Sequence, residues 1–254
     1  MRIKILGCSG SIAAGLRTTC LLVDDDILMD VGTGVGDLAL DAMSSIKTIF
    51  LTHSHLDHVA LLPMLANMAG ADHEAPLKVY ALPETIATLK KHMFNFRLWP
   101  DHTTLPSPTN PRLTFSPIKV GHTIELSGRG ITPLPAQHTV PSVGYQLDSG
   151  KASFVFSGDT YYHEPFWIAL KGISNMRYLM IEVTFLNHNL DEAKKAGHMR
   201  PELLALGLKH LDRPFQLLIT HMEPGKEDLI MTEILTAAEE FKPERLKRGQ
   251  VFEL

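Results

Sequence analysis

Three histidines and one aspartate crowded into six residues constrain this chain more than any other feature of its sequence. The segment that carries them reads Thr52-His53-Ser54-His55-Leu56-Asp57-His58. Imidazole and carboxylate groups at this density are typical of a metal site, although a histidine-rich surface turn is an alternative interpretation. The apolar run at 48–51 predicts a buried strand, and the run at 59–68 predicts a helix. A strand end that opens into a helix is where α/β proteins place their sites, so we favour the metal site.

Three more ligand-type residues lie where short apolar runs end. His138, Asp159 and His221 each follow such a run, and these runs predict β-strands. Any one of the three alone would more often be a structural polar residue than a ligand. Together with the histidine cluster, four strand ends supply seven ligand-type groups. We therefore expect these groups to converge at one edge of the fold.

The order of predicted elements favours an α/β fold. Strands are expected at residues 2–6, 18–23, 27–30, 48–52, 77–81, 113–117, 123–126, 131–135, 143–147, 153–156, 178–183 and 215–219. Helices are expected at residues 37–44, 58–69, 83–94, 164–171, 201–211 and 226–240. No internal repeat or low-complexity linker divides the sequence. We therefore expect a single domain over residues 1–254, with two mixed sheets and helices outside them.

The composition excludes several classes of protein. Hydrophobic residues make up 44% of the chain and charged residues 20%, which is ordinary for a globular protein with a large core. A formal net charge of −4 argues against a general nucleic-acid binder. Cys8 and Cys20 are too few for a disulfide framework and are expected to be reduced. No run reaches membrane-spanning length, and the apolar start is too short for a secretory segment, so we expect a cytoplasmic enzyme.

The order of these motifs resembles the metallo-β-lactamase superfamily, and the resemblance spans nearly the whole chain. It implies an αββα sandwich with two metal ions at one edge. It assigns one ion to His53, His55 and His138. It assigns the other ion to Asp57, His58 and His221, with Asp159 bridging the two.

The ligand set predicts the chemistry of the centre. Imidazole and carboxylate without thiolate suit two divalent ions, with Zn²⁺ as the first candidate and Mn²⁺ or Fe²⁺ as alternatives. Two such ions, two aspartates and a bridging hydroxide retain a net charge of roughly +1, which favours an anionic ester. A pair of ions can lower the pKa of a bridging water, hold a phosphoryl oxygen and stabilise a leaving alkoxide. Phosphodiester hydrolysis fits such a centre.

Two further motifs resemble the phosphodiesterase branch of this superfamily. They read Ile181-Glu182-Val183-Thr184-Phe185 and Gly197-His198-Met199-Arg200-Pro201. Glu182 would orient the ring of His198, which would stabilise the phosphoryl oxygens or protonate the leaving 3′ oxygen. In the plainer interpretation, His198 only precedes a helix and Glu182 is a satisfied carboxylate at a strand end.

Within that branch, the chain is more similar to class II 3′,5′-cyclic-nucleotide phosphodiesterases than to tRNA 3′-processing endonucleases. The endonucleases usually have His where this chain has Ile181. Their bacterial members carry a long basic arm, whereas only 20 residues separate His138 from Asp159 here. We therefore expect a metal-dependent phosphodiesterase that hydrolyses cAMP or cGMP to the 5′-monophosphate by a metal-bridging hydroxide. A tRNA endonuclease, a lactonase or thioesterase of the same superfamily, and a non-catalytic scaffold are the alternatives.

The sequence leaves substrate recognition open. His163 is a candidate substrate-binding residue, and it is equally placed to do no more than begin a helix. The loop at 95–112 offers aromatic groups for base stacking, for packing or for a dimer interface. The resemblance implies a homodimer, and we expect neither nucleic acid nor a membrane as a partner.

Overall fold

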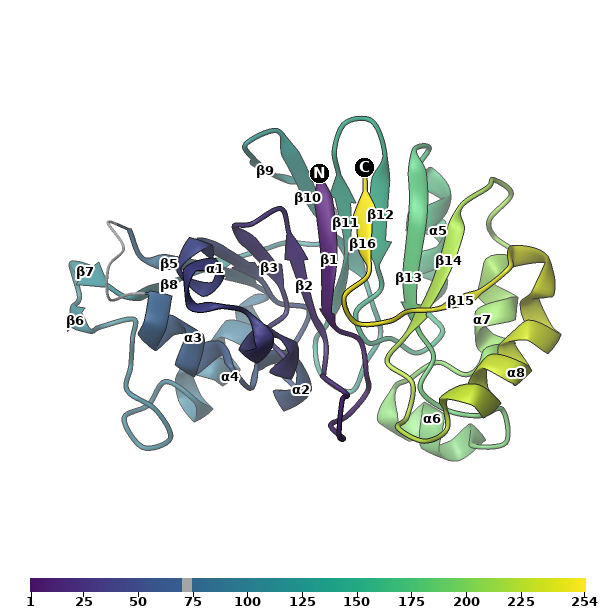
Figure 1. The fold of residues 1–254 in the computed structure, drawn as a ribbon, viewed down its shortest axis with the longest axis horizontal. Helices are drawn as coiled ribbons and strands as arrows, with labels where there is room; N and C mark the ends of the chain where they lie inside the picture. Colours follow the sequence, from purple (N-terminus) through teal and green to yellow (C-terminus); the bar gives the residue numbers. More distant parts are fainter. Residues whose placement is uncertain (70–74) are drawn as a thin grey trace.

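Two β-sheets pack face to face, and helices flank the pair on both sides (Figure 1). The computed structural model describes residues 1–69 and 75–254. Within these residues each of the two sheets has seven strands, and β6 (Pro106–Ser107) pairs with β7 (Asn110–Pro111) in a separate hairpin. The expected αββα sandwich and the α/β fold class are confirmed.

The first sheet combines the N-terminal strands with the last strand of the chain. Its order is β16 (Val251–Glu253), β1 (Arg2–Gly7), β2 (Cys20–Val23), β3 (Ile27–Met29), β4 (Thr48–Phe50), β5 (Leu77–Ala81) and β8 (Leu113–Pro117). Pairing is antiparallel from β16 to β3 and parallel from β3 to β8. The two chain ends lie side by side, and the N–H of Leu254 donates to the carbonyl of Met1.

The second sheet is built from the C-terminal half of the chain. Its order is β15 (Glu244–Arg245), β14 (Gln216–Thr220), β13 (Met176–Glu182), β12 (Ser153–Phe156), β11 (Val143–Asp148), β10 (Arg129–Pro135) and β9 (Ile124–Leu126). Pairing is antiparallel from β9 to β12 and parallel from β12 to β15. The carboxyl ends of β12, β13 and β14 therefore meet at one edge of the sheet.

The helices form two groups, one beside each sheet (Figure 1). The first group is α1 (Leu40–Ser45), α2 (Leu56–Val59), α3 (Leu62–Ala69) and α4 (Pro83–His92). The second group is α5 (Glu164–Gly172), α6 (Leu190–Ala196), α7 (Pro201–Leu208) and α8 (Glu227–Ala238). Two short 3-10 helices are η1 (Thr33–Asp37) and η2 (Glu239–Phe241). Throughout residues 1–69 and 75–254, every helix is too short or too polar to cross a membrane.

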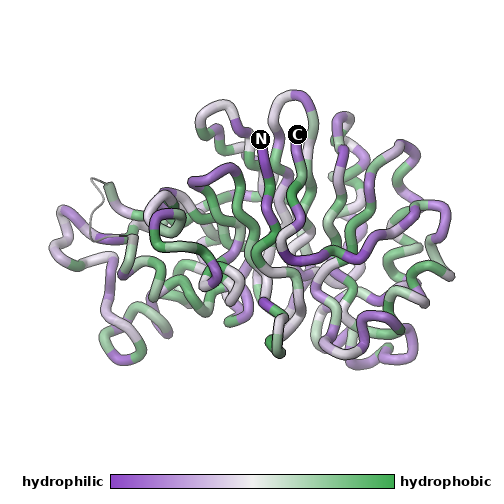
Figure 2. The backbone as a smooth tube through the Cα atoms, viewed as in Figure 1, coloured by the Kyte–Doolittle hydropathy of each residue, from purple (hydrophilic) through white to green (hydrophobic). Residues whose placement is uncertain are grey.

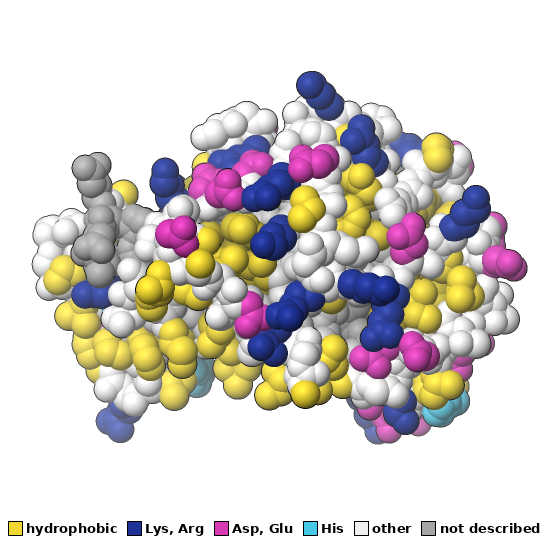
Figure 3. Space-filling model, in the orientation of Figure 1, with side chains coloured by type: hydrophobic (Ala, Val, Ile, Leu, Met, Phe, Trp, Pro, Cys, Tyr) yellow, Lys and Arg dark blue, Asp and Glu magenta, His cyan; other side chains and the backbone are white. Residues whose placement is uncertain are grey.

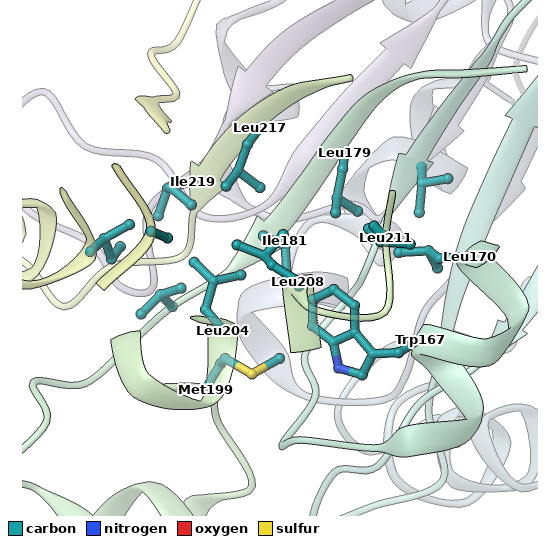
Figure 4. Close-up of a cluster of buried hydrophobic side chains, with 14 of the residues drawn as sticks. Trp167, Leu170, Leu179, Ile181, Met199, Leu204, Leu208, Leu211, Leu217 and Ile219 are labelled. Carbon is teal, nitrogen blue, oxygen red and sulfur yellow. The ribbon is translucent and has the colours of Figure 1, made fainter. Parts of the chain in front are cut away.

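The apolar core has three layers. The middle layer lies between the sheets, where the strands are mostly hydrophobic (green in Figure 2). One outer layer lies under α3 and α4, and the other lies under α5, α7 and α8, with Trp167 and Leu204 among its members (Figure 4). Both faces of β2 and β12 are covered, so all of their residues are buried. Their sequences are therefore short apolar runs instead of alternating apolar and polar residues.

Hydrogen bonds between the two sheets position the segment after β4. The hydroxyl of Tyr145, in β11, donates to the carbonyl of Leu51 at 2.7 Å. The N–H of Val143 donates to the carbonyl of Thr52 at 3.1 Å. The histidine cluster begins at the next residue, so it lies where the two sheets meet.

The helix expected at 58–69 is broken into α2 and α3. Pro63 has no N–H to donate, and its ring clashes with the carbonyl four residues earlier, so it ends one helix and begins the next. The N–H of Leu61 donates instead to the carbonyl of Val31 at 3.1 Å.

Several short elements of the structure were not predicted, namely α6, β15, β16, the hairpin of β6 and β7, and the two 3-10 helices. α6 has the short polar sequence Leu-Asp-Glu-Ala-Lys-Lys-Ala, which shows little apolar periodicity. β16 is a three-residue strand whose partner, β1, lies at the other end of the chain. The helix expected at 37–44 also shifts, because η1 precedes it and α1 begins only at Leu40.

Candidate metal centre

The seven residues predicted as ligands come together at the ends of four strands. The histidine cluster follows β4, His138 follows β10, Asp159 follows β12 and His221 follows β14. β12 and β14 point the same way in one sheet, so both end at the same edge. The bonds from β11 to the segment after β4 bring the cluster to that edge as well.

The first group of donors contains three histidines. One ring nitrogen from each of His53, His55 and His138 lies within 4.8 Å of the others. His55 Nδ1 and His138 Nε2 are 3.0 Å apart. His138 Nδ1 lies 2.9 Å from the carbonyl of Gly197, to which it donates when Nε2 serves as the ligand atom. This bond holds the ring with Nε2 toward the group.

The second group of donors has a carboxylate at its centre. Its members are Asp57, His58, Asp159 and His221. Asp159 Oδ2 lies 3.2 Å from His58 Nε2 and 3.3 Å from His221 Nε2. The same oxygen lies 3.7 Å from His53 Nε2 and 3.9 Å from His138 Nε2. Asp159 thus lies between the two groups, where the resemblance places a bridging carboxylate.

These residues fit a pair of divalent metal ions. His53 Nε2 is buried and has no hydrogen-bond partner among the described residues. A buried polar atom without a partner costs about 1–3 kcal/mol, which coordination to an ion would remove. Donor atoms bonded to one ion at about 2.1 Å lie roughly 3–3.5 Å apart, close to the spacings seen here. Nitrogen and oxygen donors without sulfur suit zinc, manganese and iron alike.

The surroundings of the two carboxylates and of His53 favour the protonation states that bind metal ions. Burial would raise the pKa of Asp159, but the rings of His221 and His58 hold it well below its usual range. Burial also opposes ionisation of Asp57, whose pKa is nevertheless lowered by hydrogen bonds from His221 and His58. Burial lowers the pKa of His53, so this ring is neutral. Ionised carboxylates and neutral imidazoles are the forms that bind metal ions.

Glu182 and His198 form a pair beside this cluster. His198 Nδ1 lies 2.9 Å from Oε1 of Glu182, which is fully buried at the end of β13. Burial lowers the pKa of His198, but the carboxylate of Glu182 outweighs burial and raises it to about 9. The ring centre of His198 is 4.8 Å from that of His138 and 5.2 Å from that of His221. The pair therefore borders both donor groups, and His198 Nε2 makes no hydrogen bond within the described residues.

Comparison with known proteins agrees with this geometry. A family model described as a β-lactamase superfamily domain matches residues 27–222, which contain all seven predicted ligands. The chain belongs to the β-lactamase superfamily. Its αββα sandwich is the metallo-β-lactamase fold. The crystal structure of unliganded yeast PDE1 shares this fold, with a TM-score of 0.82 and 18% identity over 100% of this chain and 99% of that one.

Two relatives of the chain have names that describe enzymes of phosphodiester cleavage. The chain is 25% identical to a probable 3′,5′-cyclic-nucleotide phosphodiesterase of Yersinia pestis, over 87% of this chain and 77% of the relative. It is also 29% identical to a ribonuclease Z of Mycobacterium bovis, over 63% of each chain. With a His/Asp cluster suited to metal ions, the chain is a metal-dependent hydrolase of the superfamily.

Asp30 supports His58, and the sequence analysis assigned it no such role. It is fully buried after β3 with a φ of +58°, and its Oδ2 lies 2.7 Å from His58 Nδ1. It also accepts bonds from the N–H and hydroxyl of Thr52, at 2.8 and 2.9 Å. Burial lowers the pKa of His58, but Asp159 and Asp30 raise it well above its usual value. Metal binding at His58 Nε2 would therefore displace a proton.

Asp30→Asn should weaken metal binding about 10- to 100-fold, as expected when the partner of a ligating histidine is lost. Asparagine tolerates the positive φ and can still accept the bond from Thr52, but its amide nitrogen would face the N–H of His58. Elemental analysis after dialysis measures the effect. Asp25→Asn, at an exposed position, is the control. Equal metal content in the two variants would show that Asp30 does not orient His58.

Thr184 connects His221, a predicted ligand, to the Glu–His pair. Its hydroxyl donates to Glu182 Oε2 at 2.9 Å and lies 3.0 Å from His221 Nδ1. His221 Nε2 faces Asp57 and Asp159. When Nε2 binds a metal ion, Nδ1 carries the proton and donates to Thr184. A buried chain of hydrogen bonds thus runs from His221 through Thr184 to Glu182.

Thr184→Val should lower the rate of hydrolysis roughly tenfold, since it leaves buried polar groups without a partner at a cost of about 1–3 kcal/mol. The isosteric methyl group keeps the packing and removes only the hydrogen bonds. Thr184→Ser restores the hydroxyl and should restore the rate. If serine and valine behave alike, the hydroxyl is not part of the site.

The structure does not decide the predicted roles of His163, of the loop at 95–112 or of a homodimer. His163 precedes α5, and its ring makes no hydrogen bond within the described residues, so its role in substrate binding stays a prediction. In the loop at 95–112, Trp99 donates to His102 Nε2 at 3.2 Å and packs on the first outer core layer. Both residues contribute to packing, whereas Phe96 is exposed. Their part in base stacking or in a dimer interface stays a prediction. The homodimer also stays a prediction.

Proposed function

We propose that this chain hydrolyses 3′,5′-cyclic nucleotides such as cAMP or cGMP to 5′-monophosphates. The observation that carries the proposal is the Glu182–His198 pair, 2.9 Å apart and bordering both donor groups. A lactonase or thioesterase of this fold needs the metal ligands but no such pair. Similarity to the probable 3′,5′-cyclic-nucleotide phosphodiesterase of Yersinia pestis, over 87% of this chain, supports the same substrate class.

The seven clustered residues would hold the metal ions. The first ion would be held by His53, His55 and His138. The second would be held by Asp57, His58 and His221, with Asp159 shared. Zn²⁺ is the first candidate, and Mn²⁺ or Fe²⁺ are alternatives. Bound there, such ions supply Lewis-acid polarisation of the phosphoryl group and lower the pKa of a bound water.

His198 is the residue that would donate to the phosphate oxygens of the substrate. Glu182 holds Nδ1 of the ring, so Nε2 is the atom available to a substrate. From there the ring donates a hydrogen bond to a phosphoryl oxygen or a proton to the departing 3′ oxygen. Glu182 is itself held by the N–H of Thr160 at 3.0 Å and by the hydroxyl of Thr184. The pair is therefore rigid before substrate arrives.

Processing of tRNA 3′ ends is the second candidate, because the chain is also similar to the ribonuclease Z of Mycobacterium bovis. Two features favour the small substrate. The net charge is −4, whereas proteins that bind a polyanion normally present a surplus of Lys and Arg. Only 20 residues lie between His138 and Asp159, which leaves no room there for a long RNA-binding arm.

A substrate panel on metal-loaded protein tests the proposal. We expect turnover of cAMP or cGMP that is lost with a chelator and restored by a divalent metal. The panel also contains a tRNA precursor with a 3′ extension, a lactone and a thioester. Turnover of the tRNA precursor without turnover of either cyclic nucleotide would overturn the proposal, and so would turnover of the lactone or thioester alone.

A further inference from the structure

A positively charged pocket lies away from the residues of the metal centre. Figure 3 shows Lys and Arg side chains gathered in the middle of one face, where the segment between β15 and β16 crosses the molecule in Figure 1. A pocket of about 270 Å³ opens beside this segment. Four cationic side chains line it, namely Arg17, Arg245, Lys247 and Arg248. The only carboxylate in the lining is Glu227, so the lining carries a formal charge of +3 in a chain of net charge −4.

Nearby carboxylates neutralise these cations only in part. Arg17 and Arg248 share one carboxylate, that of Asp37. Arg245 pairs with Glu227 and Asp228. Lys247 has no ion-pair partner in residues 1–69 and 75–254. Four cations thus meet three carboxylates, and the donors of Lys247 and part of the Arg248 guanidinium are free for a ligand.

The rest of the lining is mostly apolar and small. Cys8, Leu16, Met222 and Leu246 contribute to it. Ligand pockets combine an apolar lining with a few polar groups, and their volumes begin at about 300 Å³. This pocket is slightly smaller, so it suits a small molecule with one anionic end and one apolar body.

The pocket and the metal centre share a wall but no residue. The backbone of Cys8 and Ser9 separates them, since the carbonyl of Cys8 accepts a bond from the N–H of His221 at 2.9 Å. Met222, the next residue, lines the pocket. None of the seven predicted metal ligands, and neither member of the Glu–His pair, lines it.

We propose that this pocket binds a small organic phosphate monoester of about mononucleotide size, at a site distinct from the metal centre. Guanidinium groups match the oxygens of a phosphate in pairs, and a lysine adds a compact charge. A phosphate monoester carries between one and two negative charges at neutral pH, which the surplus charge of the lining accommodates.

Alkylation of the Cys8 thiol reports on the pocket separately from the metal centre. Metal-loaded protein is treated with N-ethylmaleimide with and without 5′-AMP, and the labelling of each cysteine is followed by peptide mass spectrometry. Cys20 is fully buried and serves as an internal reference. With 5′-AMP at ten times its dissociation constant, about one molecule in ten stays unliganded, so labelling of Cys8 should slow roughly tenfold. Hydrogen exchange over 8–17 and 245–250 is the second measurement and should slow with it.

Variants of the basic residues and ligands without a phosphate test whether the protection of Cys8 depends on this pocket. Lys247→Ala and the double variant Lys247→Ala/Arg248→Ala should lose the protection. Lys119→Ala/Lys151→Ala removes the same charge at exposed positions outside the pocket and should keep it. Adenosine, which lacks the phosphate, should not protect. Equal protection by adenosine or by succinate, protection that survives in the double variant, or no change in either measurement with 5′-AMP would each overturn the proposal.

Discussion

His198→Ala should lower kcat for cyclic-nucleotide hydrolysis by about 10²–10⁴-fold, the usual contribution of a positioned acid or base. The metal content should stay unchanged, because the two donor groups are complete without this ring. The loss should fall mainly on kcat, since the ring acts on the oxygens that gain charge as the bond breaks. Steady-state kinetics and elemental analysis on the same preparations measure both quantities.

A matched variant makes this result specific. His92→Ala removes an exposed histidine at the end of α4, far from the cluster in sequence, and should leave kcat unchanged. Full activity in His198→Ala would show that the Glu–His pair is not used, and would favour a lactonase or thioesterase. Loss of metal together with activity would make His198 a ligand and remove its proposed role.

Gly207→Ala should destabilise the protein by about 1–3 kcal/mol, although alanine is the better helix former by about 1 kcal/mol. Gly207 lies in α7 against the ring of Trp167, which comes from α5. Figure 4 shows this ring beside Leu208 of α7. An added Cβ would lie 1.9 Å from Trp167 Cε2 and 2.1 Å from Cζ2. The indole is fully buried, so it has no free space into which to move. The clash therefore outweighs the gain in helix propensity.

Thermal unfolding of metal-loaded protein checks this expectation. For a chain of this size a loss of about 2 kcal/mol lowers Tm by roughly 4–8 °C. Gly172→Ala is the control, because its added Cβ would meet no atom within 4 Å at the end of α5. If the two variants unfold at the same temperature, α5 and α7 do not pack as the structure shows.

Much of the site was visible in the sequence because the predicted ligands lie within a few residues of strand ends. Asp159 and His221 end parallel strands of one sheet, so their positions in the sequence already bring them to one edge. The residues that hydrogen-bond to the predicted ligand histidines could not be recognised from the sequence. Asp30 acts on a histidine 28 positions away, and Thr184 acts on one 37 positions away. The sequence around a single carboxylate or hydroxyl does not indicate which distant residue it will hydrogen-bond.

The sequence by itself predicted two mixed sheets with outer helices and seven donors at strand ends, because strand ends and ligand spacing are local properties of a chain. The αββα sandwich and the roles of Glu182 and His198 came from its resemblance to a known superfamily. Only the tertiary structure decided which ring nitrogens are held by Asp30, Thr184 and the carbonyl of Gly197. It also decided that basic residues from both ends of the chain line one pocket. These features depend on the pairing of β1 with β16 and on the packing of the two sheets, and such long-range contacts form only in the folded chain.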